Sequence, residues 1–466
     1  MDPTGHRPSD STARVQRPAP PLVRMADGTV KQVSPLTGTV VWTVPERAHR
    51  PLPGPPSARR PVDPADVDRI CAFCPERYLE TPPEKARLVG PPGQSVVHEH
   101  VPAGRLHATV AEVRRIPNLF EILAVDYWRA NHGYAVPAAV RERAAAYVSE
   151  EAGRRHVLEV LHRRHLAEGH DEGSWRAVPQ ETWLERGVDL FAGTHDVVVA
   201  RRHLVDGASY DDELASAGTL TPAEHERYVA FTVDATAALY AAQPAARYVA
   251  VFQNWLRPAG ASFDHLHKQL VAIDEHGPRA DEVLARLRRD PGLIGRDVVD
   301  HAVTHRLVVA QNEHAVALAG VGHRYPSLEV WSTRDHQLPW EHTADEVRGV
   351  SDLMHALHAA TGPLVPTNEE WHHRPPDAEQ AMPWHVVLKW RVSTLAGFEG
   401  GTNIHINTVD PFEMRDRVVG RLSSLRDAGL VAPVRIGDEC SHRPGLLRGP
   451  VPVRGPRGDR APRRSR

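Results

Sequence analysis

The stretch VFQNWLRPAGASFDHLHKQ, residues 251–269, decides the expected fold and the expected site together. Its two ends belong to short apolar runs that predict β-strands at 248–254 and 265–273. The small residues between these runs predict a tight turn. We therefore expect two strands joined by a turn, with polar side chains where the second strand begins.

The polar residues of the second strand alternate in a way that gathers them on one face. Successive side chains of a strand point to opposite faces of its sheet. His265, His267 and Gln269 are therefore expected on one face, spaced by about 6.5 to 7 Å along the strand. Leu266 and Lys268 are expected on the other face. Three polar groups would then line one wall of a site.

The turn before this strand, PAGAS at 258–262, suits a phosphate. Its small residues let the backbone approach a ligand, so that N–H groups and a hydroxyl can hold phosphate oxygens. A neutral imidazole beside that phosphate is a good nucleophile, and its phosphoramidate is a good donor. One histidine can therefore divide a nucleotidyl transfer into two easier displacements. A His-x-His pair without this context would more often be an incidental feature of a strand.

The same order of elements occurs twice along the chain. A strand at 195–203 and a helix at 222–242 precede the two strands described above. Later, a strand at 327–333, a helix at 343–361 and a strand at 384–392 repeat that order. The repetition predicts a duplicated unit of mixed α and β structure.

The composition excludes several classes of protein. The chain has 466 residues, of which 41% are hydrophobic and 25% charged, and its formal net charge is −3. This balance is ordinary for a globular protein and gives no electrostatic reason to expect nucleic acid or a membrane as a partner. The sequence lacks an apolar run of about eighteen residues and the apolar segment of a signal peptide, so the expected location is cytoplasmic.

The two ends of the chain differ from its centre. Residues 1–66 are rich in proline and are expected to be mostly irregular, with one short strand at 40–44. Residues 436–466 are rich in Arg, Pro and Gly and are expected to form a disordered tail. The remaining chain divides into an N-terminal catalytic unit, 67–275, and a C-terminal unit, 276–435.

The central motif resembles the active-site segment of the galactose-1-phosphate uridylyltransferase family, which belongs to the histidine triad (HIT-like) superfamily. The family pattern is an asparagine, a small-residue turn that ends Gly-x-Ser, and then His-Pro-His-x-Gln. The matching residues are Asn254, Gly260, Ser262, His265, His267 and Gln269. The sequence departs from the pattern at Leu256, at Asp264 and at Leu266, which stands in place of the proline.

The resemblance implies a role for each matching residue. His267 would be the residue that is covalently nucleotidylated. Gln269 would hold the phosphate oxygens, and Asn254 and Ser262 would contact the nucleotide phosphate, with Gly260 in the turn. The reaction would follow a ping-pong mechanism.

A pair of cysteines, CAFC at 71–74, predicts a metal site or, alternatively, two buried free cysteines. Two thiolates need two further ligands to complete a tetrahedral zinc site. In zinc-containing members of the family these ligands are a histidine that closes the strand before the helix and the first histidine of the motif. The resemblance thus implies one structural Zn²⁺ per chain, held by Cys71, Cys74, His203 and His265.

Some members of the family hold a second metal, iron, through a Trp-His pair and a later His-x-His. Trp371 and His372 are present here, but Val387 and Lys389 occupy the later places and His385 lies two places too early. The second site is therefore expected to be absent. The second unit also lacks an HxHxQ motif and is expected to be a degenerate repeat, kept for architecture and acceptor binding.

Further matches lie outside the central motif. RRIPN resembles a family segment that meets the base and makes Asn118 a nucleobase contact. AGFEGGTNIHINTVDP resembles a C-terminal segment that binds the acceptor and reaches a neighbouring subunit, which makes Phe398, Glu399 and Asn407 candidates and implies a homodimer. His195 is interpreted as a polar residue at the end of its strand.

The resulting fold prediction is an α+β protein of two HIT-like units, each an antiparallel sheet with packed helices, the second degenerate. The predicted activity, in carbohydrate metabolism, is transfer of a nucleotidyl group between a nucleotide sugar and a sugar 1-phosphate, of the UDP-hexose:hexose-1-phosphate uridylyltransferase type. An alternative is a phosphorylase of ADP-sugars or dinucleoside polyphosphates. An alternative of another class is an inactive, nucleotide-binding regulatory protein.

Overall fold

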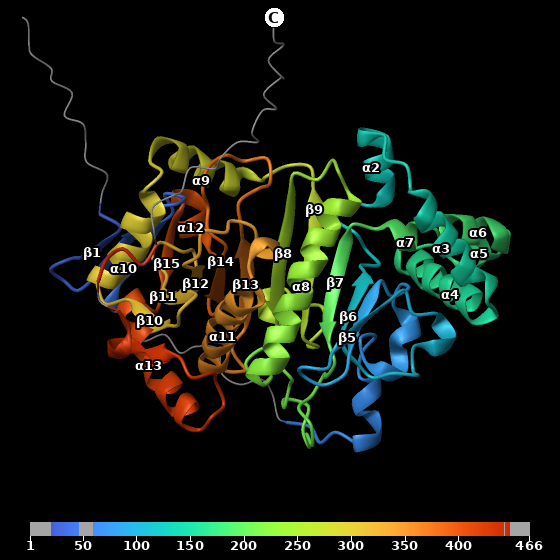
Figure 1. Cartoon of the computed structure of the whole chain (residues 1–466), viewed down its shortest axis with the longest axis horizontal. Helices are drawn as coiled ribbons and strands as arrows, with labels where there is room; N and C mark the ends of the chain where they lie inside the picture. Colours follow the sequence, from blue (N-terminus) through green and yellow to red (C-terminus); the bar gives the residue numbers. More distant parts are fainter. Residues whose placement is uncertain (1–19, 46–58, 442, 448–466) are drawn as a thin grey trace, which may run out of the picture.

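The computed structural model describes residues 20–45, 59–441 and 443–447 (Figure 1). These residues form a twelve-stranded antiparallel sheet, a second sheet of four strands, and helices that pack against the large sheet. The predicted α+β class is confirmed. None of the helices in the described ranges is long and apolar enough to span a membrane.

The large sheet consists of two halves that repeat one strand order. From the centre outward, the order is β8, β9, β7, β6, β4 and β5 in one half and β13, β14, β12, β11, β10 and β16 in the other. The halves meet where β8 pairs with β13. The strands are β4 (Ala86–Val89), β5 (Val96–Glu99), β6 (Ala111–Pro117), β7 (His195–Ala200), β8 (Tyr248–Trp255), β9 (His267–Ile273), β10 (Val308–Gln311), β11 (Ala315–Ala319), β12 (Ser327–Ser332), β13 (Thr367–His372), β14 (His385–Trp390) and β16 (Arg435–Ile436).

One long helix from each half covers the same face of the sheet (Figure 1). α8 (Pro222–Ala242) precedes β8, α11 (Ala344–Thr361) precedes β13, and the two helices pack against each other. Each begins with a capping box, from Thr221 in α8 and from Thr343 in α11. Both coincide with the predicted helices to within one residue, because the caps and the helical spacing of apolar residues are local signals.

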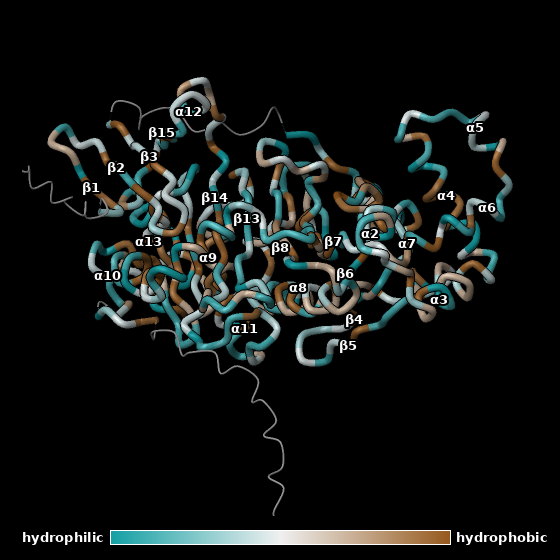
Figure 2. Tube along the Cα trace, turned by 90° about the horizontal axis from the view of Figure 1, so that it is seen from above, coloured by the Kyte–Doolittle hydropathy of each residue, from teal (hydrophilic) through white to brown (hydrophobic). Residues whose placement is uncertain are grey.

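A helical insertion that the sequence analysis did not predict separates β6 from β7. Figure 2 shows its helices α3 to α6 as a lobe at one end of the molecule. The lobe has a small core of its own, which includes Val157 and Trp183. The inserted helices are α2 (Val125–His132), α3 (Ala138–Ser149), α4 (Glu151–Ala167), α5 (Glu172–Arg176), α6 (Gln180–Arg186) and α7 (Asp189–Ala192).

The second sheet, at the opposite end of the molecule, is more ordered than predicted (Figure 2). β1 (Leu22–Arg24), β2 (Val30–Val33) and β3 (Val40–Thr43) form antiparallel pairs, and β15 (Ile404–Asn407) adds to β3 in parallel. The short strand predicted at 40–44 is present as β3, but β1 and β2 were not predicted. These strands are too short for a clear pattern, and their sheet is completed by a strand from the far end of the sequence. Residues 1–19 and 46–58 lie outside the described part.

Part of the predicted tail is folded. Ile436 pairs with Ala310 of β10 and is buried, and Cys440 beyond it is buried as well. The start of the tail at residue 436 is therefore wrong, since sheet pairing and burial continue past it. Residues 448–466 lie outside the described part. The remaining helices are α9 (Pro278–Arg289), α10 (His301–Thr304), α12 (Gly397–Thr402) and α13 (Pro411–Asp427).

A buried ion pair joins the two halves beneath the helices. Lys268 of β9 donates to Glu369 of β13 (2.5 Å) and to Gln253 of β8 (3.1 Å), and both charged side chains have no solvent exposure. Glu369 also accepts hydrogen bonds from His358 and Trp371, each at 2.6 Å. Burial would raise the pKa of Glu369, but the Lys268 charge and the His358 hydrogen bond outweigh it and hold that pKa below its usual value. Both groups are therefore charged, and each depends on the other.

We expect Lys268→Met to destabilise the protein by about 3 to 5 kcal/mol, because it leaves a buried carboxylate without its cation. Chemical denaturation would measure this free energy. Arg426→Ala is the control, because its ion pair with Glu439 is partly exposed, and it should cost about 1 kcal/mol or less. Equal effects of the two substitutions would contradict the interpretation of Lys268 and Glu369 as a buried, mutually dependent ion pair.

Candidate functional site

A tight turn carries the chain from β8 to the start of β9. Leu256 (φ 67°) and Gly260 (φ 90°) have positive φ angles, and the N–H groups of Ala259 and Ala261 donate to the Leu256 carbonyl at 3.0 and 3.3 Å. Such a backbone costs a leucine about 1 to 3 kcal/mol but is accessible to glycine. Leu256, one of the positions where the sequence departs from the family pattern, therefore adopts a backbone conformation that favours glycine. Ser262, at the end of the turn, is exposed.

His267, at the start of β9, has one free ring nitrogen. Its Nδ1 lies 2.7 Å from the carbonyl oxygen of His265, and a carbonyl can only accept, so Nδ1 carries the proton and Nε2 is unprotonated. The side chain is buried, and burial lowers its pKa to about 4. The ring of Phe73 packs against it, with centroids 5.2 Å apart. His267 is thus a neutral imidazole of fixed orientation.

Two cysteines and two histidines gather beside His267. The sulfur atoms of Cys71 and Cys74 are 3.8 Å apart, His265 Nδ1 is 3.6 and 3.7 Å from them, and His203 Nδ1 is 3.6 Å from Cys74. Tetrahedral zinc, with bonds of about 2.3 Å to sulfur and 2.0 to 2.1 Å to nitrogen, implies edges of about 3.8 and 3.5 Å. In the described part of the chain this is the one group of ligand-type side chains close enough to hold a metal.

A hydrogen bond and ring contacts around the cluster hold its side chains beside His267. His265 Nε2 donates to the carbonyl of Ala200 at 2.7 Å, which directs Nδ1 to the sulfurs. Phe73, between the two cysteines in sequence, contacts the rings of both His265 and His267. A metal held here would therefore fix the strand end that presents His267.

Gln269 meets a histidine whose role the sequence analysis missed. Its Oε1 lies 3.0 Å from Nε2 of His195, and the backbone N–H of Ile122 donates to His195 Nδ1 at 3.2 Å. Asn118 is also present, with its amide nitrogen 3.1 Å from His195 Nε2. His195 does lie at the end of its strand, as predicted, but the pairing of β7 with β9 also brings it to Gln269, which the prediction did not include. No local pattern specifies that pairing.

Asn254 is contacted by residues of the second half that were not predicted. Its Oδ1 accepts a hydrogen bond from Asn368 (2.7 Å), which also donates to the carbonyl of Ala259 in the turn (2.8 Å). Arg391 donates to Asn368 Oδ1 at 2.6 Å. A methyl group added at Gly260 would lie 3.9 Å from the amide nitrogen of Asn254, so that nitrogen lies near the turn.

The three C-terminal candidates make their contacts away from His267. The ring of Phe398 on α12 lies 6.4 Å from that of Trp42, and Glu399 accepts from the N–H of Ala396 at the start of that helix. Asn407 is buried and donates to the carbonyl of His323 at 3.2 Å. The structure therefore does not bring Phe398, Glu399 and Asn407 into the cluster around His267 within one chain.

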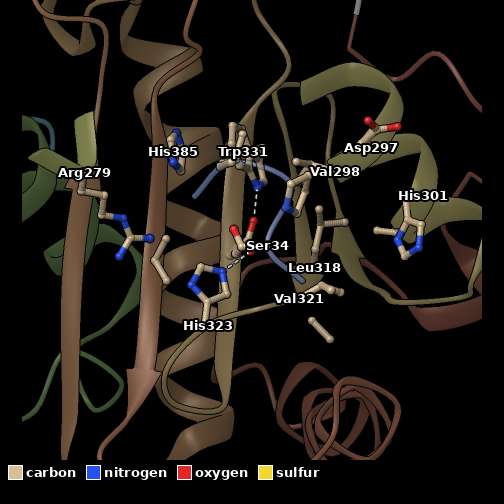
Figure 3. Close-up of a pocket in the computed structure, with 16 residues that line it drawn as sticks. Ser34, Arg279, Asp297, Val298, His301, Leu318, Val321, His323, Trp331 and His385 are labelled. Carbon is tan, nitrogen blue, oxygen red and sulfur yellow. Dashed lines mark hydrogen bonds and ion pairs between the residues drawn. The ribbon is translucent and has the colours of Figure 1, made fainter. Parts of the chain in front are cut away.

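The second half has a pocket on β12 and β14 (Figure 3). The rings of Trp331 and His385 stack there with centroids 3.8 Å apart, and Glu329 accepts from Trp331 (2.6 Å) and His323 (2.5 Å). The remaining cavity is about 30 Å³, room for about one water molecule. Bulky side chains therefore occupy the place in the second half that corresponds to the motif of the first half.

At the places of the later His-x-His pair, the structure has no ligand-type side chain. Val387 is apolar, and the Lys389 ammonium forms an ion pair with Glu370 of β13. A bound cation and this ammonium would compete for the same carboxylate. The absence of an iron site remains a prediction.

The chain matches one family model over most of its length and one curated protein over part of it. Residues 25–449 match the model of a family described as a domain of unknown function, DUF4921. A segment of 173 residues is 28% identical to ADP-glucose phosphorylase from Arabidopsis thaliana. That match covers 35% of this chain and 49% of the relative, so the chain spans about half the length of the curated relative.

Two solved structures share the fold. The crystal structure of ADP-glucose phosphorylase from Arabidopsis thaliana with bound ADP-glucose has a TM-score of 0.53 at 18% identity, and the match covers 84% of this chain and 97% of that chain. A GalT-like protein from the same organism has a TM-score of 0.52 at 16% identity, covering 83% and 97%. The predicted resemblance to galactose-1-phosphate uridylyltransferase-like proteins is confirmed at the level of fold.

The cluster predicts about one tightly bound metal ion per chain, which elemental analysis of the purified protein would measure. We expect Cys74→Ser to lose the metal and to lower Tm, because the binding energy of a structural metal contributes to folding. Cys440→Ser is a matched control, since Cys440 is also buried and free but lies outside the cluster. A stable protein without metal would contradict the assignment.

Proposed function

The chain belongs to the DUF4921 family, and we propose that it is a nucleotidyltransferase that acts through a covalent nucleotidyl group on His267. The observation that carries the proposal is the fixed protonation of this imidazole. Nδ1 donates to the His265 carbonyl, which leaves the Nε2 lone pair for attack beside the turn at Gly260.

The proposed reaction has two displacements at one phosphorus atom. In the first, His267 Nε2 bonds to the nucleotide's α-phosphorus, and the bond from that phosphorus to the sugar 1-phosphate breaks. In the second, an oxygen of the acceptor bonds to the same phosphorus, and the bond to Nε2 breaks. The imidazole returns neutral, and its Nδ1–H remains bonded to His265 throughout, which stabilises the positive charge of the intermediate.

The neighbouring groups would hold the phosphate during both steps. Gln269 lies two residues after His267 on β9, and Asn254 lies on the paired strand β8. Gly260 and Ser262 belong to the turn where backbone and hydroxyl donors can meet phosphate oxygens. Asn118, within contact of His195, is proposed to meet the nucleobase. These donors would stabilise the charge that develops in the transition state.

We assign the metal as a structural Zn²⁺. Its support is the donor set, two thiolates and two imidazoles in tetrahedral arrangement, which leaves no open position for a substrate. Bound zinc would fix the strand end that carries His267, and all chemical steps would belong to the protein's own residues.

For the substrate we propose an ADP-sugar, with inorganic phosphate as the acceptor. The partial match to ADP-glucose phosphorylase favours this choice over transfer between UDP-hexose and a hexose 1-phosphate. Phe398 is exposed on α12, and Glu399 lies beside it at the start of that helix. Both are proposed to meet the acceptor in a second copy of the chain, in a homodimer. Asn407 would act indirectly, by holding β15 to His323.

Incubation with ADP-glucose and no acceptor should add one adenylyl group, which intact-protein mass spectrometry would detect and peptide mapping would place on His267. Phosphate should then release it as ADP. A uridylyl adduct formed from UDP-glucose and released by hexose 1-phosphate would favour the uridylyltransferase alternative. Nucleotide binding without any adduct would instead favour the inactive regulatory protein.

His267→Ala should lower kcat by about a thousandfold or more, equivalent to about 4 kcal/mol, because no other group replaces the attacking nitrogen. Nucleotide binding should change little, since the turn and both amides remain. Gln269→Ala should retain partial activity, because it removes one hydrogen bond to phosphate. Turnover of the His267→Ala protein at the wild-type rate would overturn the covalent mechanism.

A further inference from the structure

The side-chain amides of Asn254 and Gln269 have little freedom to rotate by half a turn. An Asn or Gln amide can rotate by half a turn and exchange its oxygen for its nitrogen, so its polarity toward a ligand is set by its neighbours. A phosphate needs donors, which requires both NH₂ groups to face the site. We propose that Asn368 and His195 are positioning residues that lock the amides of Asn254 and Gln269 with their NH₂ groups toward the phosphoryl group.

The polarity of Asn368 is fixed from both sides. Arg391 can only donate, and it donates to Asn368 Oδ1 at 2.6 Å. The carbonyl of Ala259 can only accept, and it takes a hydrogen bond from Asn368 Nδ2 at 2.8 Å. If the Asn368 amide rotated by half a turn, it would lose the hydrogen bonds to Arg391 and to the Ala259 carbonyl. Its NH₂ group would then face the Arg391 N–H, and its oxygen would face the Ala259 carbonyl oxygen.

The fixed Asn368 determines the orientation of Asn254. The same Asn368 nitrogen lies 2.7 Å from Asn254 Oδ1, so the oxygen of Asn254 must face the second half of the sheet. Its NH₂ group then points the other way, toward the turn at Gly260. A residue of β13 thereby sets the polarity of a residue on β8.

A backbone N–H group fixes the tautomer of His195, the residue proposed to position Gln269. The N–H of Ile122 can only donate, and it lies 3.2 Å from His195 Nδ1. Neutral imidazole carries one proton, so that proton is on Nε2, which faces Gln269 Oε1 at 3.0 Å. With its oxygen occupied, Gln269 presents its NH₂ group to the site.

The segment that holds His195 in place is the one proposed to meet the nucleobase. Asn118 N–H donates to the His195 carbonyl (2.7 Å), and Glu121 accepts from the N–H groups of Thr194 (2.9 Å) and His195 (3.2 Å). The Asn118 amide nitrogen also lies 3.1 Å from His195 Nε2 and competes with Gln269 Oε1 for that ring atom. His195 thus connects the nucleobase segment to the phosphate amide.

Neutron diffraction from crystals of the metal-loaded protein grown in D₂O tests the orientations directly. We expect deuterium on His195 Nε2 and none on Nδ1, with the deuterated amide nitrogens of Gln269 and Asn254 turned away from His195 and Asn368. Deuterium on His195 Nδ1, or an amide nitrogen facing its positioning residue, would overturn the inference. This measurement needs no substrate and is decisive even if the proposed nucleotidyl transfer fails.

Kinetics tests the consequence, which rests on the proposed function. His195→Leu should slow adduct formation by about tenfold or more in the wild-type background, because one phosphate donor is no longer held in place. In a Gln269→Ala background it should cost almost nothing further, since its partner is absent. His195→Gln, which can place an amide N–H near the Nε2 position, should restore part of the rate.

Two further variants separate orientation from packing. Asn368→Asp keeps the shape of the side chain but cannot donate to Asn254 and Ala259, and it should slow adduct formation about tenfold or more. His342→Leu is the control, because His342 is buried and bonded through both ring nitrogens, to Ser332 and the Leu338 carbonyl. It should lower Tm without slowing the adduct step.

Absence of an adduct in the wild-type protein would refute the proposed function and leave the neutron result to decide the inference. Full additivity of His195→Leu with Gln269→Ala would refute the inference while the function stands. An Asn368→Asp protein with the wild-type rate would do the same.

Discussion

The antiparallel pairing of β8 with β13 is the contact on which the rest of the structure depends. It joins two halves of a sheet into one continuous surface and sets Asn254 opposite Asn368. On the face under α8 and α11, the same register lets Lys268 of β9 reach Glu369 of β13. A shift by one residue would reverse every side chain of β13, separating both pairs and leaving charges buried without partners.

The site around His267 is built from segments far apart in the sequence. The cysteines come from the loop before the sheet, His203 follows β7, and His265 precedes β9. Because the four ligands belong to three segments, a bound metal would hold three parts of the chain together beside His267. Phe73 adds a packing contact between this cluster and His267.

The second half contributes to the site without repeating it. Its own strands carry the stacked Trp331 and His385 and a lysine that pairs with Glu370, so its counterpart of the motif is filled by side chains. It supplies Asn368 and Arg391 to the first half instead. A repeat that lacks the motif thus contacts the motif of the first half through the strand pairing at the centre of the sheet.

The sequence by itself determined what local chemistry specifies. Capping threonines and helical spacing defined α8 and α11, and alternation defined β8 and β9. These elements survive in the structure because they depend on neighbours within a few residues. The resemblance to the uridylyltransferase family pointed to His267, Gln269 and Asn254 and to the four members of the metal cluster, which the structure brings together.

Only the tertiary structure decided how distant segments meet. The proposed roles of His195 and Asn368 depend on the register of β7 with β9 and of β8 with β13. Asn407 is buried and donates a hydrogen bond to the carbonyl of His323. The small sheet needs β15 to complete it. Register and pairing are set by the sum of contacts across the whole sheet, and no single segment of sequence encodes that sum.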